Sequence, residues 1–325
     1  MKYFIYLLLF CCAHLNAVNL AQAGNFESNN MTINGTDYHY ISKGDPKNPL
    51  ILFLHGFPES SIAWSDQLET FSQNYHAVAI DLKGYGLSGK PSEISAYTVE
   101  SVMEDVSLFA KNLSNKPFVL VGHDWGGAIA WYFGIKHPEQ LSKLIVINGA
   151  HPIQFFREYF TNQAQYDASE YIRQIQTGEH DTSFYSKDNF KELRVTLFDN
   201  SIGQAQTFFD NEMQKNYLNS WSIDHAFDSS LNYYKAMKFP PSILFTAGLP
   251  VHLNPLFNSF HVEKVPTLVL WGEKDIYLNK SVNDGLEKMV SDLKIIYFPN
   301  NSHWIVHEIP DQISSKISEF ISLNK

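Results

Sequence analysis

Cysteine is nearly absent from this chain. Its 325 residues include two cysteines, Cys11 and Cys12, and both lie close to the N-terminus. If that terminal segment is removed by processing, the mature protein contains no cysteine and forms no disulfide, unlike many secreted domains. A disulfide framework is therefore excluded for the rest of the chain.

An excess of basic residues and long apolar runs are lacking as well. The formal net charge is -10, which disfavours nucleic acid or an anionic membrane as a partner. Beyond the N-terminus, no run is apolar and long enough to span a bilayer. We find no internal repeat or low-complexity tract. The composition, 44% hydrophobic and 18% charged, is that of an ordered protein with one large domain or a domain with an insertion.

The N-terminal residues have the layout of a secretory signal peptide. Lys2 is followed by the apolar run YFIYLLLFCCA, and the sequence AQA ends at Ala23. A basic start, an apolar run of about 7–15 residues and an A-x-A site are typical of such signals. We predict that residues 1–23 are cleaved off, with Ala17 as the alternative site, and that the protein is periplasmic or secreted. The competing interpretation is a membrane anchor or a first core element.

Short apolar runs bounded by turn-forming residues predict a largely parallel β-sheet. They are rich in Val, Ile and Leu and do not alternate, as expected of strands buried on both faces. The runs read PLILFLHG, YHAVAIDLKG, PFVLVGHD, LSKLIVING, VPTLVLWGEKD and LKIIYFPN. Before them, MTINGTDYHYIS alternates around Asn34-Gly35, which is a strong signal for a β-hairpin.

Helical patterns between these runs predict an α/β fold with helices on both faces of the sheet. One such pattern starts after Thr98, a candidate N-cap. From about residue 151 to 255 the strand signal stops, and this gap is too long for a loop. We predict a helical cap there, inserted over the C-terminal edge of the sheet, between core segments 24–150 and 256–325.

The stretch GHDWG, from Gly122 to Gly126, ends a predicted strand and starts a predicted helix. Such a sharp corner strains the central residue and leaves little room for side chains beside it. Asp124 stands at the centre, where several hydrolases have serine, and no G-x-S-x-G occurs in the chain. The helix start behind it favours a carboxylate. Asp124 is therefore a candidate nucleophile, the alternative being a simple helix N-cap.

A second stretch, HGFP from His55 to Pro58, also directly follows a predicted strand. Its position allows the backbone N–H of Phe57 to join that of Trp125 in an oxyanion hole. Pro58 is a candidate for a cis peptide bond. These two N–H groups would stabilise negative charge that develops on an oxygen near the GHDWG corner.

Two late strands are followed by an acid and a histidine. Asp275 comes just after LVLWGEK, and His303 follows the last predicted strand. Because parallel strands end at one edge of the sheet, both side chains are expected near Asp124. Each is weak evidence alone, since the chain has 13 histidines, including His123 and His307, and Asp275 could be a turn residue. Together, the order nucleophile, acid and base predicts a catalytic triad.

From the hairpin near residue 31 to the C-terminal helix, the chain resembles the epoxide hydrolases of the α/β-hydrolase fold. The resemblance rests on HGFPE, GHDWGG, DLKGYGLSGKP and HPEQLSKLIVINGAHP. Haloalkane and fluoroacetate dehalogenases share these motifs, so the motifs identify the aspartate-nucleophile branch better than its substrate. The site implied comprises Asp124, His303 and Asp275 as catalytic residues and His55, Pro58 and Trp125 as substrate contacts.

An aspartate nucleophile suits substitution at a saturated carbon, because carboxylate attack there gives an alkyl ester of the enzyme. A water activated by His303, with Asp275 orienting the imidazole, would then hydrolyse that ester. The leaving group is accordingly an epoxide oxygen or a halide.

The resemblance implies two cap tyrosines as proton donors for an epoxide oxygen. The segment LNYYKAM resembles the family's second tyrosine region and assigns Tyr234 rather than Tyr233. The segment QYDASEYIRQIQTGE resembles the first tyrosine region and points to Tyr171, with Tyr166 as its rival.

Two positions favour an epoxide over a halide. Haloalkane dehalogenases usually carry Asn where Phe57 stands, and fluoroacetate dehalogenases typically carry Arg where Trp125 stands. We therefore expect a cofactor-free and metal-free hydrolase acting on a small-molecule epoxide, with a haloalkane or haloacid dehalogenase as the alternative. A non-catalytic receptor is disfavoured because no triad member is missing. A homodimer is one candidate oligomeric state.

Overall fold

The computed structural model describes residues 25–199, 209–246 and 255–322. The predicted signal segment, with Cys11 and Cys12, lies outside the described residues. Within them, no helix combines the length and the apolar character needed to cross a membrane.

One sheet contains the eight strands of the described chain, in the order β1-β2-β4-β3-β5-β6-β7-β8. The hairpin strands β1 and β2 are antiparallel to their neighbours, and the other strands run parallel. This confirms the predicted hairpin and a strand at each of the six apolar runs. The predicted burial on both faces was wrong for the last run, because β8 is the edge strand and its residues are half-buried or exposed. The strands are β1 Glu27–Ile33, β2 Thr36–Lys43, β3 Leu50–Leu54, β4 His76–Ile80, β5 Phe118–His123, β6 Leu141–Ile147, β7 Thr267–Gly272 and β8 Leu293–Phe298.

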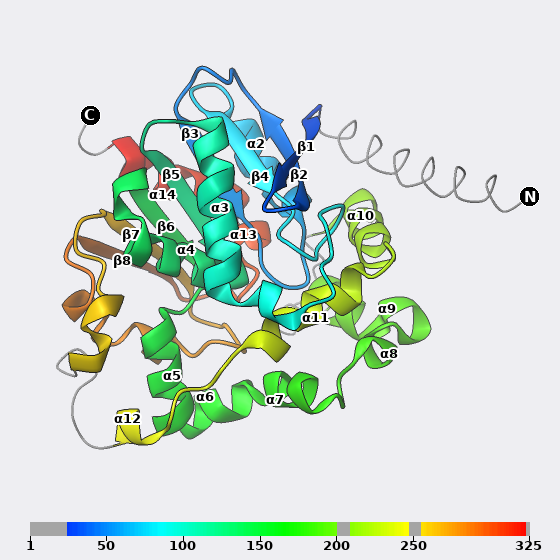
Figure 1. Cartoon of the computed structure of the whole chain (residues 1–325), viewed down its shortest axis with the longest axis vertical. Coiled ribbons are helices and arrows are strands. Elements are labelled where there is room, and N and C mark those ends of the chain that lie inside the picture. Colours follow the sequence, from blue (N-terminus) through cyan, green and yellow to red (C-terminus); the bar gives the residue numbers. More distant parts are fainter. Residues whose placement is uncertain (1–24, 200–208, 247–254, 323–325) are drawn as a thin grey trace, which may run out of the picture.

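Central strands are apolar throughout because both faces of the sheet are covered. In β3, Leu52 and Leu54 pack into one hydrophobic cluster while Ile51 and Phe53 pack into another on the opposite face. The first cluster includes α3 (Val99–Leu113) and α4 (Trp125–Lys136), which cross the sheet in Figure 1. The second includes α2 (Ser65–Phe71), α13 (Ile305–Glu308) and α14 (Pro310–Ser322).

The start of α3 follows from its sequence. Thr98 is the N-cap, and its side-chain oxygen accepts a hydrogen bond from the backbone N–H of Ser101 at 3.3 Å, as predicted. Shorter 3-10 or π-helical segments complete the described chain at η1 Ser61–Trp64, η2 Ile94–Tyr97, η3 Pro138–Gln140, η4 Val195–Asp199, η6 Pro255–Phe260, η7 Lys280–Asn283 and η8 Leu286–Lys288.

Between β6 and β7 the chain forms helices and no strand among its described residues. These helices are α5 Pro152–Thr161, α6 Gln163–Ala168, α7 Glu170–Thr177, α8 Thr182–Tyr185, α9 Lys187–Arg194, α10 Asn211–Trp221, α11 Ala226–Ala236 and α12 Ile243–Thr246. Figure 1 shows most of them below the sheet, away from the end of the molecule that carries the C-terminus, with α10 higher at the right of the view. We refer to this helical segment, α5 to α12, as the cap.

Candidate active site

The corner between β5 and α4 places Asp124 in a strained backbone conformation, with φ 52° and ψ -117°. Both flanking glycines are required by close backbone approach. A Cβ on Gly122 would lie 2.2 Å from the Gly126 carbonyl oxygen, and a Cβ on Gly126 would lie 2.1 Å from that of Leu54. Only glycine fits these positions, in agreement with the sequence interpretation. A strained residue at the end of a sheet strand is typical of a functional position.

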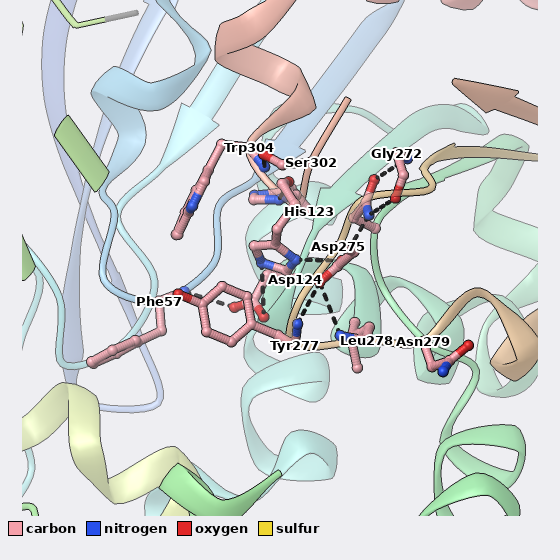
Figure 2. A network of polar contacts seen from close by, with 12 residues as sticks. Phe57, His123, Asp124, Gly272, Asp275, Tyr277, Leu278, Asn279, Ser302 and Trp304 are labelled. Carbon is pink, nitrogen blue, oxygen red and sulfur yellow. Dashed lines mark hydrogen bonds and ion pairs between the residues drawn. The ribbon is translucent and has the colours of Figure 1, made fainter. Parts of the chain in front are cut away.

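The Asp124 carboxylate is not used to cap the helix that follows it. Although Asp124 holds the N-cap position of α4, its side chain makes no capping hydrogen bond. Its Oδ1 instead accepts a hydrogen bond from the Phe57 backbone N–H at 2.8 Å (Figure 2). Gly56 allows this approach, since a Cβ there would lie 2.3 Å from the Asp124 Cβ. The simple N-cap interpretation does not fit this geometry.

His303 lies between the two predicted carboxylates. Its Nδ1 is 2.7 Å from Asp275 Oδ2, and its Nε2 is 3.6 Å from Asp124 Oδ2. Burial alone would lower the pKa of the imidazole, but the charge and hydrogen bond of Asp275, with a further contribution from Asp124, raise it to about 9. The structure thus brings together the three residues that the sequence placed at the ends of different strands.

Asp275 is held by more groups than the sequence indicated. Its Oδ1 accepts hydrogen bonds from the backbone N–H groups of Tyr277 at 2.8 Å and Leu278 at 2.9 Å, as Figure 2 shows. Its Oδ2 also accepts one from Asn148 Nδ2 at 2.7 Å. Asn148 directly follows β6, so it too stands at the C-terminal edge of the sheet. A polar residue at that place was the signal that sequence reasoning overlooked.

Two tyrosines of the cap face the Asp124 carboxylate. Tyr171 comes from α7 and Tyr234 from α11, and their ring centroids lie 5.6 Å apart in a T-shaped arrangement. Burial raises the pKa of both hydroxyls well above the ordinary tyrosine value, and the negative charge of Asp124 adds to the effect. The rival Tyr166 is 39% exposed and stacks under the Arg173 guanidinium instead.

Two cavities meet at these residues. The larger has a volume of about 320 Å³ and the smaller about 220 Å³, and Asp124, Tyr171 and Tyr234 line both. The larger is otherwise lined mainly by apolar side chains that include Trp125, Ala128, Phe155, Phe156 and Met237. The smaller includes Phe57, Pro58, Phe184, Leu193 and Trp304. A ligand that reaches both cavities passes directly over the carboxylate.

Comparison with known proteins places this geometry in a family. The family model described as alpha/beta hydrolase fold matches residues 49–310. Epoxide hydrolase 3 of Xenopus tropicalis is 32% identical over 298 residues, which cover 90% of this chain and 76% of that protein. Epoxide hydrolase 4 of Mus musculus is 31% identical over 290 residues, covering 88% and 77%. The chain belongs to the epoxide hydrolases of the α/β-hydrolase fold.

A solved structure agrees with this assignment. Bacillus megaterium epoxide hydrolase, determined in complex with an inhibitor, superposes with a TM-score of 0.79 at 33% identity. The match covers 90% of this chain and 100% of the bacterial protein. The predicted fold is therefore confirmed, and the protein is a hydrolase.

The three predicted substrate contacts of this hydrolase lie in different places. Trp125 lines the larger cavity, and Pro58, which follows a cis peptide bond, lines the smaller. His55 does neither. Its side chain is fully buried, with Nδ1 2.8 Å from the Gly56 carbonyl oxygen and Nε2 accepting the Leu82 N–H at 3.0 Å. Because both ring nitrogens bind backbone and His55 lines neither cavity, the structure gives no support to the prediction of a substrate contact; His55 instead holds the loop that carries Phe57.

Sequence reasoning missed two other neighbours of the site. Tyr277 lines the smaller cavity, and its ring centroid is 5.1 Å from that of His303. Glu59, the residue after Pro58, is buried beneath the site. Among the described residues, no group of three or more His, Cys, Asp or Glu side chains is arranged to hold a metal ion.

Proposed function

We propose that this enzyme converts epoxides into vicinal diols through an alkyl ester on Asp124. One observation carries the proposal: Tyr171 and Tyr234 border the same two cavities as the Asp124 carboxylate. A nucleophile on one side of a cavity and two hydroxyl donors on the other suit ring opening, because the epoxide oxygen must be protonated as it leaves. Membership of the epoxide hydrolase family supports the same reaction.

In the first step, Asp124 attacks the less hindered epoxide carbon and the bond from that carbon to the ring oxygen breaks. Oδ1 is engaged by the Phe57 N–H at 2.8 Å, which leaves Oδ2 to form the ester bond. The ring oxygen takes a proton from Tyr171 or Tyr234. Since burial raises the pKa of both hydroxyls, they remain protonated at neutral pH and can donate.

Formation of the ester lowers the pKa of His303, as the second step requires. The Asp124 charge helps to raise the pKa of this imidazole to about 9, and alkylation removes that charge. The imidazole then loses its proton more readily and can act as a general base for water. Water adds to the Asp124 Cγ, and the oxyanion that forms on Oδ1 faces the N–H of Phe57, with that of Trp125 as the second donor. Collapse of this intermediate breaks the bond from Cγ to the alkyl oxygen, which takes the proton held by His303 and leaves as the second diol hydroxyl. The proton on the new Asp124 carboxyl returns to the tyrosinate left by the first step, so the carboxylate and both tyrosines are restored.

A His303→Gln variant tests the ester directly. Ring opening needs no base, so styrene oxide should add to the protein and the adduct should accumulate in an intact-mass spectrum. Absence of an adduct with styrene oxide and with several other epoxides would contradict the proposal. Release of halide from bromoalkanes, without diol formation from any epoxide, would favour a dehalogenase instead.

Isotope placement gives an independent test with the unmodified enzyme. Because water attacks Cγ, a single turnover in ¹⁸O-labelled water should leave the label in the peptide that contains Asp124 and not in the diol. Label found in the diol after a single turnover would indicate direct attack of water on the epoxide.

We further propose that the enzyme is exported after cleavage of residues 1–23, on the basis of the N-terminal sequence pattern. Expression of the full chain in a bacterial host, followed by fractionation and N-terminal sequencing, tests this. The expected N-terminus is Gly24, in the periplasm or the medium. An uncleaved chain in the cytosol would contradict export and would leave the catalytic proposal intact.

A further inference from the structure

The backbone segment that follows Asp275 is bound by two different groups. Residues 277–279, which we call the acid loop, donate the N–H groups of Tyr277 and Leu278 to the Asp275 carboxylate. The same segment exchanges hydrogen bonds with the side chain of Gln165, a residue of cap helix α6. The acid loop therefore connects the acid of the triad to the cap.

Gln165 makes two hydrogen bonds to the backbone of the acid loop. Its Nε2 donates to the Tyr277 carbonyl oxygen at 2.9 Å, and its Oε1 accepts the Asn279 N–H at 2.8 Å. These partners fix the orientation of the side-chain amide, because a carbonyl oxygen can only accept and an N–H can only donate. Gln165 is 0% exposed, so water does not compete for either contact.

A single peptide group links Gln165 to the acid. The Tyr277 carbonyl oxygen and the Leu278 N–H belong to the same peptide group, and in a trans peptide they point in opposite directions. The carbonyl oxygen binds Gln165, while the N–H binds Asp275 Oδ1 at 2.9 Å. Hydrogen bonds in such a chain polarise one another, so donation by Gln165 strengthens the donation to the carboxylate.

Ser169 holds the Gln165 side chain and connects it to a proton donor. Its hydroxyl accepts a hydrogen bond from Gln165 Nε2 at 3.0 Å and donates to the Gln165 carbonyl oxygen at 2.8 Å. Ser169 is fully buried and directly precedes α7, the helix of Tyr171. The ring centroid of Tyr277 lies 5.8 Å from that of Tyr171 and 5.1 Å from that of His303. One buried contact thus joins the start of α7 to the acid loop.

We propose that Gln165 is a positioning residue of the cap, which fixes the acid loop and, through it, the Asp275 carboxylate that orients His303. The inference rests on the proposed role of His303 as the base that hydrolyses the Asp124 ester. Gln165 lines neither of the two cavities and acts only through the acid loop. The edge of the sheet holds the base directly, and the cap supports that arrangement from behind.

Loss of this support should weaken the contact between the acid and the base. Burial lowers the pKa of His303, but the charge and hydrogen bond of Asp275 outweigh burial, with smaller contributions from other carboxylates. If Asp275 is held less firmly, the imidazolium loses part of its main stabilising contact and its pKa falls. Ester hydrolysis needs the neutral base in a defined orientation, so its rate should fall and its half-maximal pH should move down.

NMR titration of the substrate-free enzyme tests this effect without turnover. Gln165→Met approximately keeps the side-chain volume and removes both hydrogen bonds to the acid loop. The midpoint of the His303 ring titration should fall by about half a pH unit. Gln67→Met is the matched control, because Gln67 is equally buried but lies in α2, where its Nε2 is 3.5 Å from Ser314 Oγ of α14. An unchanged midpoint in Gln165→Met, or an equal shift in Gln67→Met, overturns the proposal.

Single-turnover kinetics separate positioning from a simple loss of folded protein. With rapid quench and intact-mass detection, hydrolysis of the ester should slow about 10-fold in Gln165→Met, with its half-maximal pH moved down. A purely structural defect would reduce the amount of active enzyme and leave that pH unchanged, against the proposal. Formation of the ester needs no base and should change by less than about threefold. A larger loss in formation than in hydrolysis would assign Gln165 to the first step and also overturn the proposal.

Two further measurements keep the proposal testable if Gln165→Met does not fold. Gln165→Asn retains a buried amide that is too short to reach both peptide groups, and it should shift the His303 midpoint in the same direction. In the wild type, the Asn279 N–H should be protected from hydrogen exchange, and exchange as fast as in an open loop would overturn the proposal without any variant. An enzyme that forms no ester with any epoxide would refute the proposed function, whereas the titration and the exchange would still test the role of Gln165.

Discussion

The edge of the sheet and the cap build the same site by different means. At the edge, charged groups are fixed by backbone hydrogen bonds: Asp124 by the Phe57 N–H, and Asp275 by the N–H groups of Tyr277 and Leu278. In the cap, Tyr171 and Tyr234 lie in a network of ring contacts. Backbone hydrogen bonds define direction strictly, whereas aromatic contacts accept a range of geometries. We infer that the edge fixes the nucleophile and the base, whereas the cap supplies the proton donors and sets which epoxide reacts.

The largest loss of activity is expected from a substitution at the edge of the sheet. Asp124→Ser removes the carboxylate that we propose forms the ester. Diol formation should fall by more than about 10⁴-fold, as is usual for a lost nucleophile. Asp167→Ser, at an exposed aspartate of the cap, is the control and should leave the rate unchanged. Residual activity within tenfold of wild type would rule out Asp124 as the nucleophile.

The next largest loss of activity is expected from substitutions in the cap. Tyr171→Phe and Tyr234→Phe should each lower kcat/KM by about 10–100-fold, and the double variant by about 10³-fold or more, because each hydroxyl partly replaces the other as donor. Tyr233→Phe is a close control, because its hydroxyl already donates to the Lys83 carbonyl oxygen at 2.9 Å. That variant should lose about 1 kcal/mol of stability and little activity. Equal losses of kcat/KM in Tyr233→Phe and Tyr234→Phe would contradict the assignment of Tyr234 as a proton donor.

The loss of a support residue at the edge should matter less than the loss of the nucleophile or of both tyrosines. Asn148→Gly removes the hydrogen bond to Asp275 but tolerates the positive φ of 38° at that position. Because the acid is then held less firmly, kcat should fall by about 10–100-fold. The His303→Gln trap offers a check, since the rate of ester formation should be the same with and without Asn148. A slower adduct in the double variant would place Asn148 in the first step instead.

Two buried histidines, His303 at the sheet edge and His151 at the start of the cap, should make opposite contributions to how stability depends on pH. The pKa of His303 is raised to about 9, so its contribution to folding is present below pH 6.5 and is lost as pH rises through 9. Burial lowers the pKa of His151, at the start of the cap, to about 4, so stability is lost as pH falls from 6.5 through 4.

Urea unfolding of the wild type, His303→Gln and His151→Gln between pH 4 and 10 measures both contributions. The penalty of His303→Gln should shrink by up to about 3 kcal/mol between pH 6 and pH 10. The wild type should lose stability below pH 6.5 relative to His151→Gln. Parallel curves for all three proteins would show that neither histidine titrates differently in the folded chain.

Much of the edge was predictable from sequence because its rules are local. Gly122 and Gly126 mark a corner where a Cβ would strike backbone, and Asp275 and His303 directly follow apolar strands. The edge also shows where such reasoning stops. His55 lies in a motif beside the site, yet its ring binds Gly56 and Leu82. Whether a polar side chain faces a cavity or the backbone depends on tertiary packing that no strand pattern encodes.

The cap was predictable as helical but not in its side-chain contacts. Tyr171 and Tyr166 stand five positions apart in the same sequence pattern, and only packing decides that Tyr171 lines the cavities while Tyr166 stacks on Arg173. Similarly, Asn148 and Glu59 act through partners far along the chain, Asp275 and Tyr217. One sequence without relatives contains no signal for such pairs.

The smallest expected effect concerns the two cavities, and it separates chemistry from selectivity. Ala128→Leu narrows the larger cavity and Thr196→Leu the smaller one, while both leave Asp124 and the tyrosines in place. Rates with a small epoxide such as propylene oxide should change by less than about threefold. With an internal epoxide that carries one long and one short substituent, each variant should lose about 10-fold or more and should change which carbon is attacked, because the long arm is forced into the other cavity. Equal losses for small and large epoxides would mean that the substitutions disturb the sheet edge, and the division of labour between edge and cap would fail.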